Sequence, residues 1–543
     1  MIVTKITSSL EKPFLKDTID SFPELSRMSA LQNEEIHFQL LMASDSRDPV
    51  RVHVGCQTEL PSSLRSVESV PVGFPTYSSS DPAQYISTEP GLFPDWLQPL
   101  QYDDCMILTS GQLRSVWVTL HTEDFSGEQT ITLRVTDKQN EPIAEQSLRL
   151  DVIPVRLPES DLTITNWFHT DCLASYYSVP VFSEAYWSIV ENFMQKASDL
   201  GINMLLTPVL TPPLDTEIGG ERPTVQLVGI TVSDDGAYSF DYTNLDRWIG
   251  LCLKHGIRYF EISHLFSQWG AAKAPKVVGV RDGKTVNLFG WETDSLSEPY
   301  TDFLKTFIPA LVSHLEEKGV LDRCYFHISD EPNANCLETY RKARDLVKPL
   351  IGSRPIMDAL SDVAFYLDGL VDVPIPATDH IDSFLSKGIS GLWSYYCCGQ
   401  HTNLSNRFIA QSSPRNRIIG TQWFKYEIRG FLQWGFNYYF NMGSHDLINP
   451  YLENSGSFQV PAGDPFIVYP APDGTAFDSV RGLVFKEAVQ DLAAFNLCAS
   501  RIGHEATVAL LENVLGPIAF NKCTDEASPL LKARDAVNQA LKQ

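Results

Sequence analysis

The 543-residue sequence is poor in basic residues: 42 Lys and Arg face 67 Asp and Glu, a formal net charge of −25 at pH 7. A field of this sign repels phosphate backbones and anionic lipid surfaces, so we expect neither nucleic acid nor a membrane as a partner. No apolar run reaches the roughly 18 residues that a membrane-spanning helix requires. With 43% hydrophobic and 20% charged residues, the composition is that of a globular protein.

The sequence also lacks the signatures of several enzyme classes. Neither GxGxxG nor GxxxxGK[ST] follows an expected strand, and no GxSxG occurs, so nucleotide binding and acyl-enzyme hydrolysis have no support. The ten cysteines form no CxxC pair, and most lie in apolar runs where Cys acts as a small apolar residue. The first residues, MIVTKITSSLEKPFLKDTIDSF, contain no apolar stretch of signal-peptide length. We therefore expect a protein of the reducing cytoplasm.

Residues 1–157 have the texture of an antiparallel β-sandwich. Short alternating or β-branched runs are bounded by Gly, Pro, Asp or Ser, and no long helical period intervenes. Residues 65–104 are rich in Pro, Ser and Tyr. We expect a long ordered excursion there, with a disordered linker as the alternative.

From about residue 160, strand-like and helix-like segments alternate. This pattern predicts a (β/α)8 TIM-type barrel over residues 158–505, followed by a short C-terminal helical cap over residues 506–543. An open, doubly wound sheet is the alternative, but it lacks the nucleotide-binding motif noted above. The expected barrel strands are 162–169, 203–209, 258–266, 323–332, 354–360, 371–378, 391–398 and 431–440.

An adjacent carboxylate pair ends the fourth expected strand, in FHISDEPN. Barrel enzymes place their active sites at the carboxyl ends of the strands, so Asp330 and Glu331 are candidate catalytic residues. Two carboxyls this close push one pKa up and keep the other down, which is the division of roles that glycoside cleavage needs. In the alternative interpretation, one of them caps the following helix or pairs with a cation such as Arg341.

Aromatic residues are concentrated at the ends of the last two strands. Sugar rings have an apolar face that packs on indole or phenol rings, so aromatics there favour carbohydrate binding, although about half are expected to pack into the core. Trp269 adds a further aromatic on a loop. The expected substrate-binding residues are His169, His264, Trp393, Tyr395, Tyr396, Trp434 and Asn437.

A metal site is the competing interpretation of the histidines. It would use His169, His264 and Asp358, but a strand-one HxH pair is replaced by FHTD, which has one His. His327 lies in mid-strand, where a core role is expected. We expect no metal and no cofactor.

Four segments together resemble glycoside hydrolase family 123, the β-N-acetylgalactosaminidases, and related barrel domains without assigned activity. They are FHISDEPN, GDPFIVYPAPDG with SVRGLVFKEAVQDL, GLWSYYCC, and QWGFNYYF. The family architecture, a sandwich followed by a barrel, is the one expected here, and the likeness covers most of the chain.

The resemblance implies a retaining, exo-acting hexosaminidase with substrate-assisted catalysis, acting on an oligosaccharide or glycoside that ends in a 2-acetamido sugar. Asp330 would orient the acetamido N–H and stabilise an oxazolinium intermediate, and Glu331 would protonate the leaving oxygen and then activate water. Further roles implied are a hydrogen bond to the acetamido oxygen from Tyr395 or Tyr396, contact of the sugar with Trp393 and Trp434, and structural roles for Arg481, Glu487 and Asp491. A non-catalytic carbohydrate-binding protein and a metal-dependent hydrolase remain alternatives, and the sequence indicates no oligomeric state.

Overall fold

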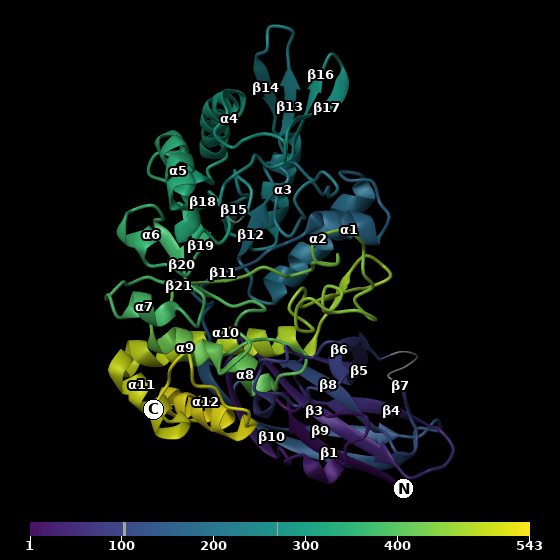
Figure 1. Cartoon of the computed structure of the whole chain (residues 1–543). Helices are drawn as coiled ribbons and strands as arrows, with labels where there is room; N and C mark the ends of the chain where they lie inside the picture. The colour runs from purple at the N-terminus through teal and green to yellow at the C-terminus, as the bar shows by residue number, and fades with distance from the viewer. Residues whose placement is uncertain (101–104, 269, 543) are drawn as a thin grey trace.

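The structure is a computed structural model that describes residues 1–100, 105–268 and 270–542. Its N-terminal part contains two five-stranded sheets in these residues (Figure 1). One sheet has the order β1 (Ile2–Ser8), β3 (Glu35–Ser44), β8 (Leu113–His121), β5 (Ser62–Val72) and β6 (Gly91–Pro99). The other has the order β2 (Arg27–Gln32), β10 (Pro142–Arg156), β9 (Gly127–Thr136), β4 (Val50–Gln57) and β7 (Cys105–Leu108).

The predicted N-terminal antiparallel sheets are confirmed, with one exception: β2 runs parallel to β10. Alternate apolar residues of both sheets meet in one buried cluster, which includes Phe38 and Leu40 from β3, Val52 from β4 and Leu133 from β9. The period-two pattern of the sequence therefore reflects two sheets packed face to face, where each fully buried Val, Leu or Phe side chain contributes roughly 1.5–3 kcal/mol.

The Pro- and Ser-rich excursion between β5 and β6 crosses to the second domain. Residues 73–90 include the 3₁₀ turn η2 (Pro82–Gln84). Ser80 Oγ lies 2.8 Å from His401 Nδ1, the Tyr85 hydroxyl donates to His401 O at 2.7 Å, and the Ile86 N–H donates to Ala410 O at 2.9 Å. This part of the excursion is ordered as predicted, and residues 101–104 lie outside the described residues.

Parallel strands form the centre of the second domain. Six of them make a sheet in the order β18 (Cys324–Phe326), β15 (Tyr259–Ile262), β12 (Met204–Thr207), β11 (Thr163–Asn166), β22 (Gly430–Gln433) and β21 (Trp393–Tyr395). Two more, β19 (Met357–Ala359) and β20 (Val373–Ile375), pair with each other in parallel. Single parallel bridges, Phe326 with Ile356 and Ala377 with Tyr395, link this pair to the two ends of the sheet.

Each of these strands overlaps a predicted one and is shorter; seven lie wholly inside the predicted range, and β22 begins one residue earlier, at Gly430. After β18, for example, His327 to Ser329 stay buried without belonging to the strand. An apolar run thus predicts burial correctly and overestimates the length of the hydrogen-bonded ladder.

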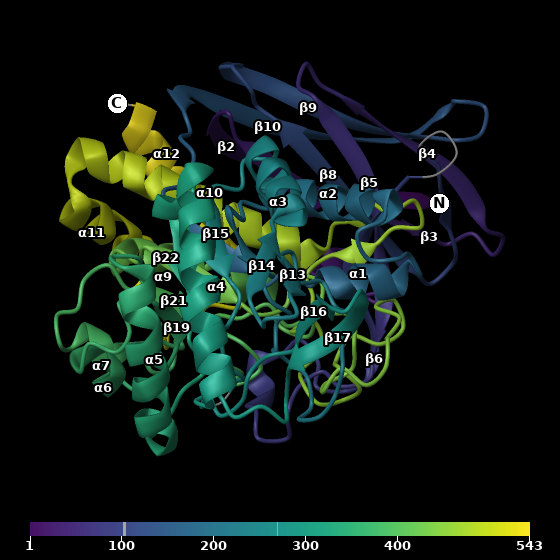
Figure 2. The ribbon, with the colours of Figure 1, turned by 90° about the horizontal axis from the view of Figure 1, so that it is seen from above.

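Helices follow the strands on the outside, and Figures 1 and 2 both place α5, α6 and α7 together along one outer side. The second helix begins at a serine cap, since Ser183 accepts a hydrogen bond from the Tyr186 N–H. The helices are α1 (Thr170–Tyr176), α2 (Glu184–Asp199), α3 (Thr243–Lys254), α4 (Glu298–Glu317), α5 (Leu337–Ile351), α6 (Ala364–Leu367), α7 (Ile381–Leu385), α8 (Ser413–Arg417), α9 (Ile419–Lys425) and α10 (Val480–Ile502). Short 3₁₀ turns are η1 (Ile19–Ser21), η3 (Leu321–Arg323) and η4 (Ala334–Cys336).

A four-stranded sheet that the sequence analysis did not predict projects at the top of Figure 1. Its order is β14 (Tyr238–Asp241), β13 (Gly229–Val232), β16 (Val277–Arg281) and β17 (Lys284–Phe289). These hairpins belong to the connections that leave the carboxyl ends of β12 and β15. The long connection from β22 to α10 contains the small pair β23 (Tyr469–Pro470) and β24 (Ala476–Phe477).

The last helices join the two domains. Helix α10 passes between them (Figure 1), and its Arg481 forms a bidentate pair with Asp95 of β6 at 2.8 and 2.9 Å. Helices α11 (His504–Leu515) and α12 (Ala527–Lys542) pack on α10, and Arg534 of α12 pairs with Glu34 at 2.8 Å. Across the described ranges, no helix combines the length and the apolar character needed to span a bilayer.

Candidate active site

The carboxylate pair lies just beyond β18, where the parallel strands end. Both residues are partly exposed, and Glu331 has φ +43°, a left-handed conformation that residues other than glycine rarely adopt. In an extended chain the two side chains would point in opposite directions. The turn at Glu331 interrupts that alternation, and such strain is typical of functional sites.

Neither structural alternative for this pair holds. The turn η4 is capped by the Asn333 side chain, and α5 begins after Cys336. The cation considered as a partner, Arg341, pairs instead with Asp368 at 2.8 Å. In the described ranges, no ion pair and no helix cap involves Asp330 or Glu331.

Tyr395 is the neighbour that contacts Glu331. It is the last residue of β21, is 7% exposed, and donates its hydroxyl to Glu331 Oε1 at 2.8 Å. Burial and the nearby Glu331 carboxylate raise the pKa of Tyr395 well above its usual value, so the phenol keeps its proton and remains a donor. One oxygen of Glu331 is thereby fixed, and the other is left for a ligand.

Asp330 is held in a different electrostatic environment. Burial raises its pKa well above the ordinary value, and the charges of Glu331 and Asp215 add to the effect. In the free protein Asp330 therefore binds its proton more tightly than an ordinary aspartate does. Asp215, on the loop after β12, also has a raised pKa, about 7, because of burial and nearby carboxylates.

A charged histidine lies three residues before Asp330. His327 is fully buried between two carboxylates, with Nδ1 2.7 Å from Asp358 Oδ1 and Nε2 2.7 Å from Glu261 Oε1. Burial opposes its charge, but the hydrogen bonds with Asp358 and Glu261 raise the pKa of His327 to about 10. The loop that carries Asp330 thus starts from an imidazolium locked between β15 and β19.

His264 stacks on this imidazolium. The two rings lie 4.1 Å apart, and both His264 nitrogens are buried without a partner among the described residues. Burial and the positive charge of His327 hold the pKa of His264 well below its usual value, so it is neutral. A buried imidazole with both nitrogens free is suited to bind a ligand.

His264, His327 and Asp358 are also the residues that could hold a metal ion, since their candidate ligand atoms lie within 4.8 Å of one another. Both nitrogens of His327 already face carboxylates, however, so a metal would have to displace Glu261 or Asp358. The donor set fits a charged hydrogen-bond network better than a metal centre. The trio of the alternative metal interpretation, His169, His264 and Asp358, is not assembled, because His169 bonds Trp434 O and Arg222 instead.

The polar side-chain atoms of His169 and Asn437 already form hydrogen bonds within the protein. His169 Nε2 donates to Trp434 O at 2.9 Å, and Nδ1 accepts from Arg222 at 3.1 Å. Asn437 Oδ1 and Nδ2 bond the backbone N–H and C=O of His169 at 2.9 and 3.1 Å. Burial and Arg222 lower the pKa of His169 to about 4, so it is neutral. This arrangement fixes the ends of β11 and β22 relative to each other.

The predicted aromatics divide into two groups. Trp434 lies just after β22, and its indole donates to Asp464 Oδ2 at 2.9 Å. Trp393 is the first residue of β21, at the opposite end from Tyr395, and packs against Tyr325 at 5.8 Å. Tyr396 is fully buried against Phe431, with ring centroids 4.9 Å apart. The structure therefore brings Tyr395 to Glu331 but not Trp393 or Tyr396, and Trp269 lies outside the described residues.

Two carboxyls near the pair were not singled out from the sequence. Asp464 is fully buried, and burial raises its pKa to about 6 against the effect of the Trp434 hydrogen bond. Asp464 belongs to the GDPFIVYP segment, which is part of the family resemblance, so the sequence did offer a signal for this residue. Asp215 follows an irregular Pro-rich stretch, PPLD, which carries no periodic signal.

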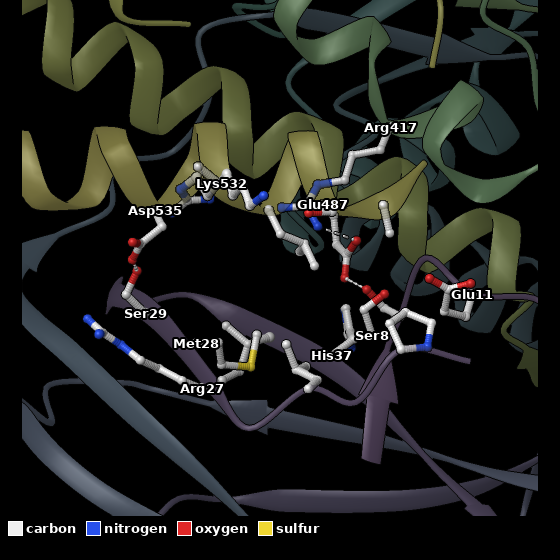
Figure 3. Close-up of a pocket in the computed structure, with 18 of the residues that line it drawn as sticks. Ser8, Glu11, Arg27, Met28, Ser29, His37, Arg417, Glu487, Lys532 and Asp535 are labelled. Atoms are coloured by element: carbon white, nitrogen blue, oxygen red, sulfur yellow. Dashed lines mark hydrogen bonds and ion pairs between the residues drawn. The ribbon is translucent and has the colours of Figure 1, made fainter. Parts of the chain in front are cut away.

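A separate cavity of about 470 Å³ lies between the N-terminal sheets and helices α10 and α12 (Figure 3). Its charged groups largely pair with one another or with hydroxyls: Glu487 accepts from Ser9 at 2.7 Å and pairs with Arg417 at 2.9 Å, and Ser29 donates to Asp535 at 2.5 Å. Among the described residues, no Phe, Tyr or Trp lines it. It lacks the aromatic surface expected of a sugar site, so the carboxylate pair remains the candidate active site.

Two adjacent carboxyls thus lie beyond a parallel strand, one of them held by a phenol, an arrangement suited to acid–base chemistry. The catalytic-domain model of glycoside hydrolase family 123 matches residues 167–498. The chain therefore belongs to glycoside hydrolase family 123, which acts on carbohydrates.

One solved structure agrees in fold over the whole chain. A family 123 glycoside hydrolase from Clostridium perfringens, described for glycolipid glycan hydrolysis, is 16% identical with a TM-score of 0.74, over 100% of this chain and 97% of that chain. A Bacteroides ovatus GH5 xyloglucanase is 9% identical, with a TM-score of 0.30 over 90% of this chain and all of its own, too low to support a conclusion. None of the curated proteins searched matches this chain.

Proposed function

We propose that this chain is a retaining, exo-acting β-N-acetylgalactosaminidase-like hexosaminidase in which the 2-acetamido group of the substrate is the nucleophile. The observation that carries the proposal is the geometry of the pair: Glu331 is held by Tyr395, and Asp330 has no partner among the described residues. A carboxyl fixed through one oxygen suits proton transfer, and a neighbouring unpartnered carboxyl suits an N–H ligand.

In the first step, the acetamido oxygen attacks the anomeric carbon and the glycosidic bond breaks. Glu331 gives its proton to the leaving oxygen, and an oxazolinium ion forms. In the second step, Glu331 takes a proton from water, which attacks the anomeric carbon and reopens the ring. Tyr395 holds Glu331 Oε1 throughout, which leaves Oε2 to face the oxygen that gains or loses the proton.

Asp330 orients the acetamido N–H and balances the positive charge of the oxazolinium. It can do so only as an anion, yet its pKa in the free protein is raised. Asp330 must therefore be deprotonated before the reaction can occur. We expect the apparent pKa of the acid limb in the pH profile of kcat/KM to lie above the ordinary aspartate value of about 3.9.

The substrate contacts that the geometry supports are Tyr395, Trp434 and His264. The Trp434 indole bonds Asp464, a carboxyl whose charge acts on Asp215, and His264 has two buried nitrogens without a partner among the described residues. His169 and Asn437 serve in the proposal as positioning residues for the loop after β22, because their polar atoms bond each other and Trp434.

We further propose that the second domain is the TIM-type (β/α)8 barrel expected over residues 158–505. The single bridges on either side of β19 and β20 support a closed ring of parallel strands. Residues 1–157 and 506–543 are proposed as the sandwich and the helical cap. The ten free cysteines support a reducing cytoplasm as the location.

The test uses p-nitrophenyl β-N-acetylgalactosaminide, its gluco epimer and a glycolipid-type oligosaccharide. Wild type should release nitrophenol, and Glu331→Gln or Asp330→Asn should lower kcat by about 10²- to 10⁴-fold. The control is Glu338→Gln, an exposed residue that pairs with Lys342, and it should be unchanged. Absence of release from every substrate by wild type would refute the proposal.

The mechanism has its own test. An N-trifluoroacetyl substrate carries a weaker acetamido nucleophile and should react more slowly, and a thiazoline that mimics the oxazoline should inhibit competitively. Equal rates for the two N-acyl groups would show that the acetamido oxygen does not attack.

A further inference from the structure

Asp215 lies on the long loop that follows β12, close enough to the catalytic pair for its charge to act on both members. Its backbone is held firmly: the N–H donates to Gln268 at 2.9 Å, and the C=O accepts from Tyr438 at 3.1 Å and Ser444 at 2.7 Å. These bonds keep Asp215 at φ +53°, a strained conformation. The loop thus presents this carboxyl in one fixed position.

The carboxyl itself is not satisfied by the protein. Oδ2 of Asp215 is buried and has no hydrogen-bond partner among the described residues. Arg222, a cation whose charge acts on Asp215, gives its hydrogen bonds elsewhere, since it forms two bonds to Asp171 at 2.6 and 2.9 Å. A buried carboxyl oxygen without a donor is costly, by about 1–3 kcal/mol or more. A ligand that supplies a donor removes this cost.

We propose that Asp215 binds a hydroxyl group of the sugar ring that is cleaved, and thereby determines which sugars the site accepts. The inference rests on the proposed function, because a sugar hydroxyl is the donor that a glycosidase substrate brings to this place. A site built to hydrogen-bond a hydroxyl rejects analogues that lack it, because the carboxyl is then buried without a partner. The raised pKa of Asp215 is consistent with a carboxyl that awaits a donor.

The experiment is a cycle between protein and substrate variants. Wild type, Asp215→Asn and Asp215→Gly are assayed with the parent p-nitrophenyl N-acetylhexosaminide and its 3-, 4- and 6-deoxy analogues. Glycine removes the carboxyl at no backbone cost at positive φ, and asparagine tolerates this conformation better than most residues. Glu217→Gln, an exposed residue on the same loop, is the control. Thermal midpoints check that each variant is folded.

With wild type, one deoxy analogue should lose about 10- to 150-fold in kcat/KM, the worth of a hydrogen bond to a charged group. For Asp215→Gly, kcat/KM for the parent substrate should be lower than in wild type by the same factor. The kcat/KM of this variant for the sensitive deoxy analogue should equal that of wild type for the same analogue. Asp215→Asn should lose less than Asp215→Gly, because its amide oxygen still accepts. If every deoxy analogue loses the same factor in wild type and in Asp215→Gly, the proposal is wrong.

Two further outcomes would also overturn it. Equal losses for asparagine and glycine would mean that the charge of Asp215 matters and hydrogen bonding does not. Wild type could also prefer a cationic 2-amino sugar, with this preference lost in Asp215→Asn. That result would mean that Asp215 binds an ammonium group and not a hydroxyl. Calorimetric titration of the free sugars into Glu331→Gln tests the hydroxyl contact without turnover, so it separates failure of this inference from failure of the proposed function.

Discussion

Removing one oxygen atom from Tyr395 tests how Glu331 works. Tyr395→Phe deletes the 2.8 Å hydrogen bond to Glu331 and leaves the ring in its buried position. A hydrogen bond to a charged acceptor contributes about 1.5–3 kcal/mol, which corresponds to about a 10- to 150-fold loss in kcat. The matched control is Tyr396→Phe on the next residue, whose buried hydroxyl has no partner in the described chain and should be dispensable.

The choice of leaving group separates chemistry from structure. If Tyr395 positions Glu331 for proton donation, the loss should be large for an alkyl or oligosaccharide aglycone, which needs a proton. It should nearly vanish for a dinitrophenyl aglycone, which leaves as a stable anion. The assay is kcat and KM for both substrates with wild type and the two variants. A loss equal for both aglycones, or equal in Tyr396→Phe, refutes this role of Tyr395.

Three further predictions concern the surrounding charges. Asp215→Asn should move the acid limb of kcat/KM to lower pH, because it removes one of the charges that raise the pKa of Asp330; an unmoved limb would contradict this. Burial raises the pKa of Glu487 from 4.5 to about 7, so its contribution to stability is complete below 4.5 and is lost as pH rises through 7, a change of about 3 kcal/mol. The thermal midpoint of Glu487→Gln should therefore rise relative to wild type between about pH 5 and pH 8. Arg222→Leu should lower the midpoint more than Arg222→Leu with Asp171→Asn, because the single change strands a buried carboxylate; equal midpoints would show that the pair adds nothing.

Sequence patterns located the strands of the second domain but not their ends. Apolar runs report burial, and residues such as Ile328 are buried without belonging to the strand. The inserted sheet was missed although a signal exists. Asp235-Gly236 and Asp282-Gly283 are the turn pairs that favour two-residue hairpins, and three of these four residues have positive φ. The strands beside Asp235-Gly236 also alternate, with Ile230 and Val232 buried on β13, but each is only four residues long and so gives a weak period-two signal.

The candidate site was predictable where chemistry is local in the chain. Asp330 and Glu331 follow one another, and a strand-end rule finds them. The partners of the pair come from other elements: Tyr395 from β21 and Asp215 from the loop after β12. Neighbouring positions 393, 395 and 396 look alike in sequence. Only the register of β21 decides that Tyr395 reaches Glu331 while Trp393 lies at the far end of the strand and Tyr396 packs on Phe431.

The ion pair between Arg534 and Glu34 joins residues 500 positions apart. At about 5–20 residues per second, a ribosome needs on the order of 25–100 s between them. During that interval Glu34 lacks the pairing with Arg534, and the face of the N-terminal sheets that α12 covers is exposed. A chain cut before α12 would lack this ion pair and the helix that covers β2 and β10. The charge balance of an early segment therefore depends on a helix that is made 500 residues later, because Arg534 supplies the cation that pairs with Glu34.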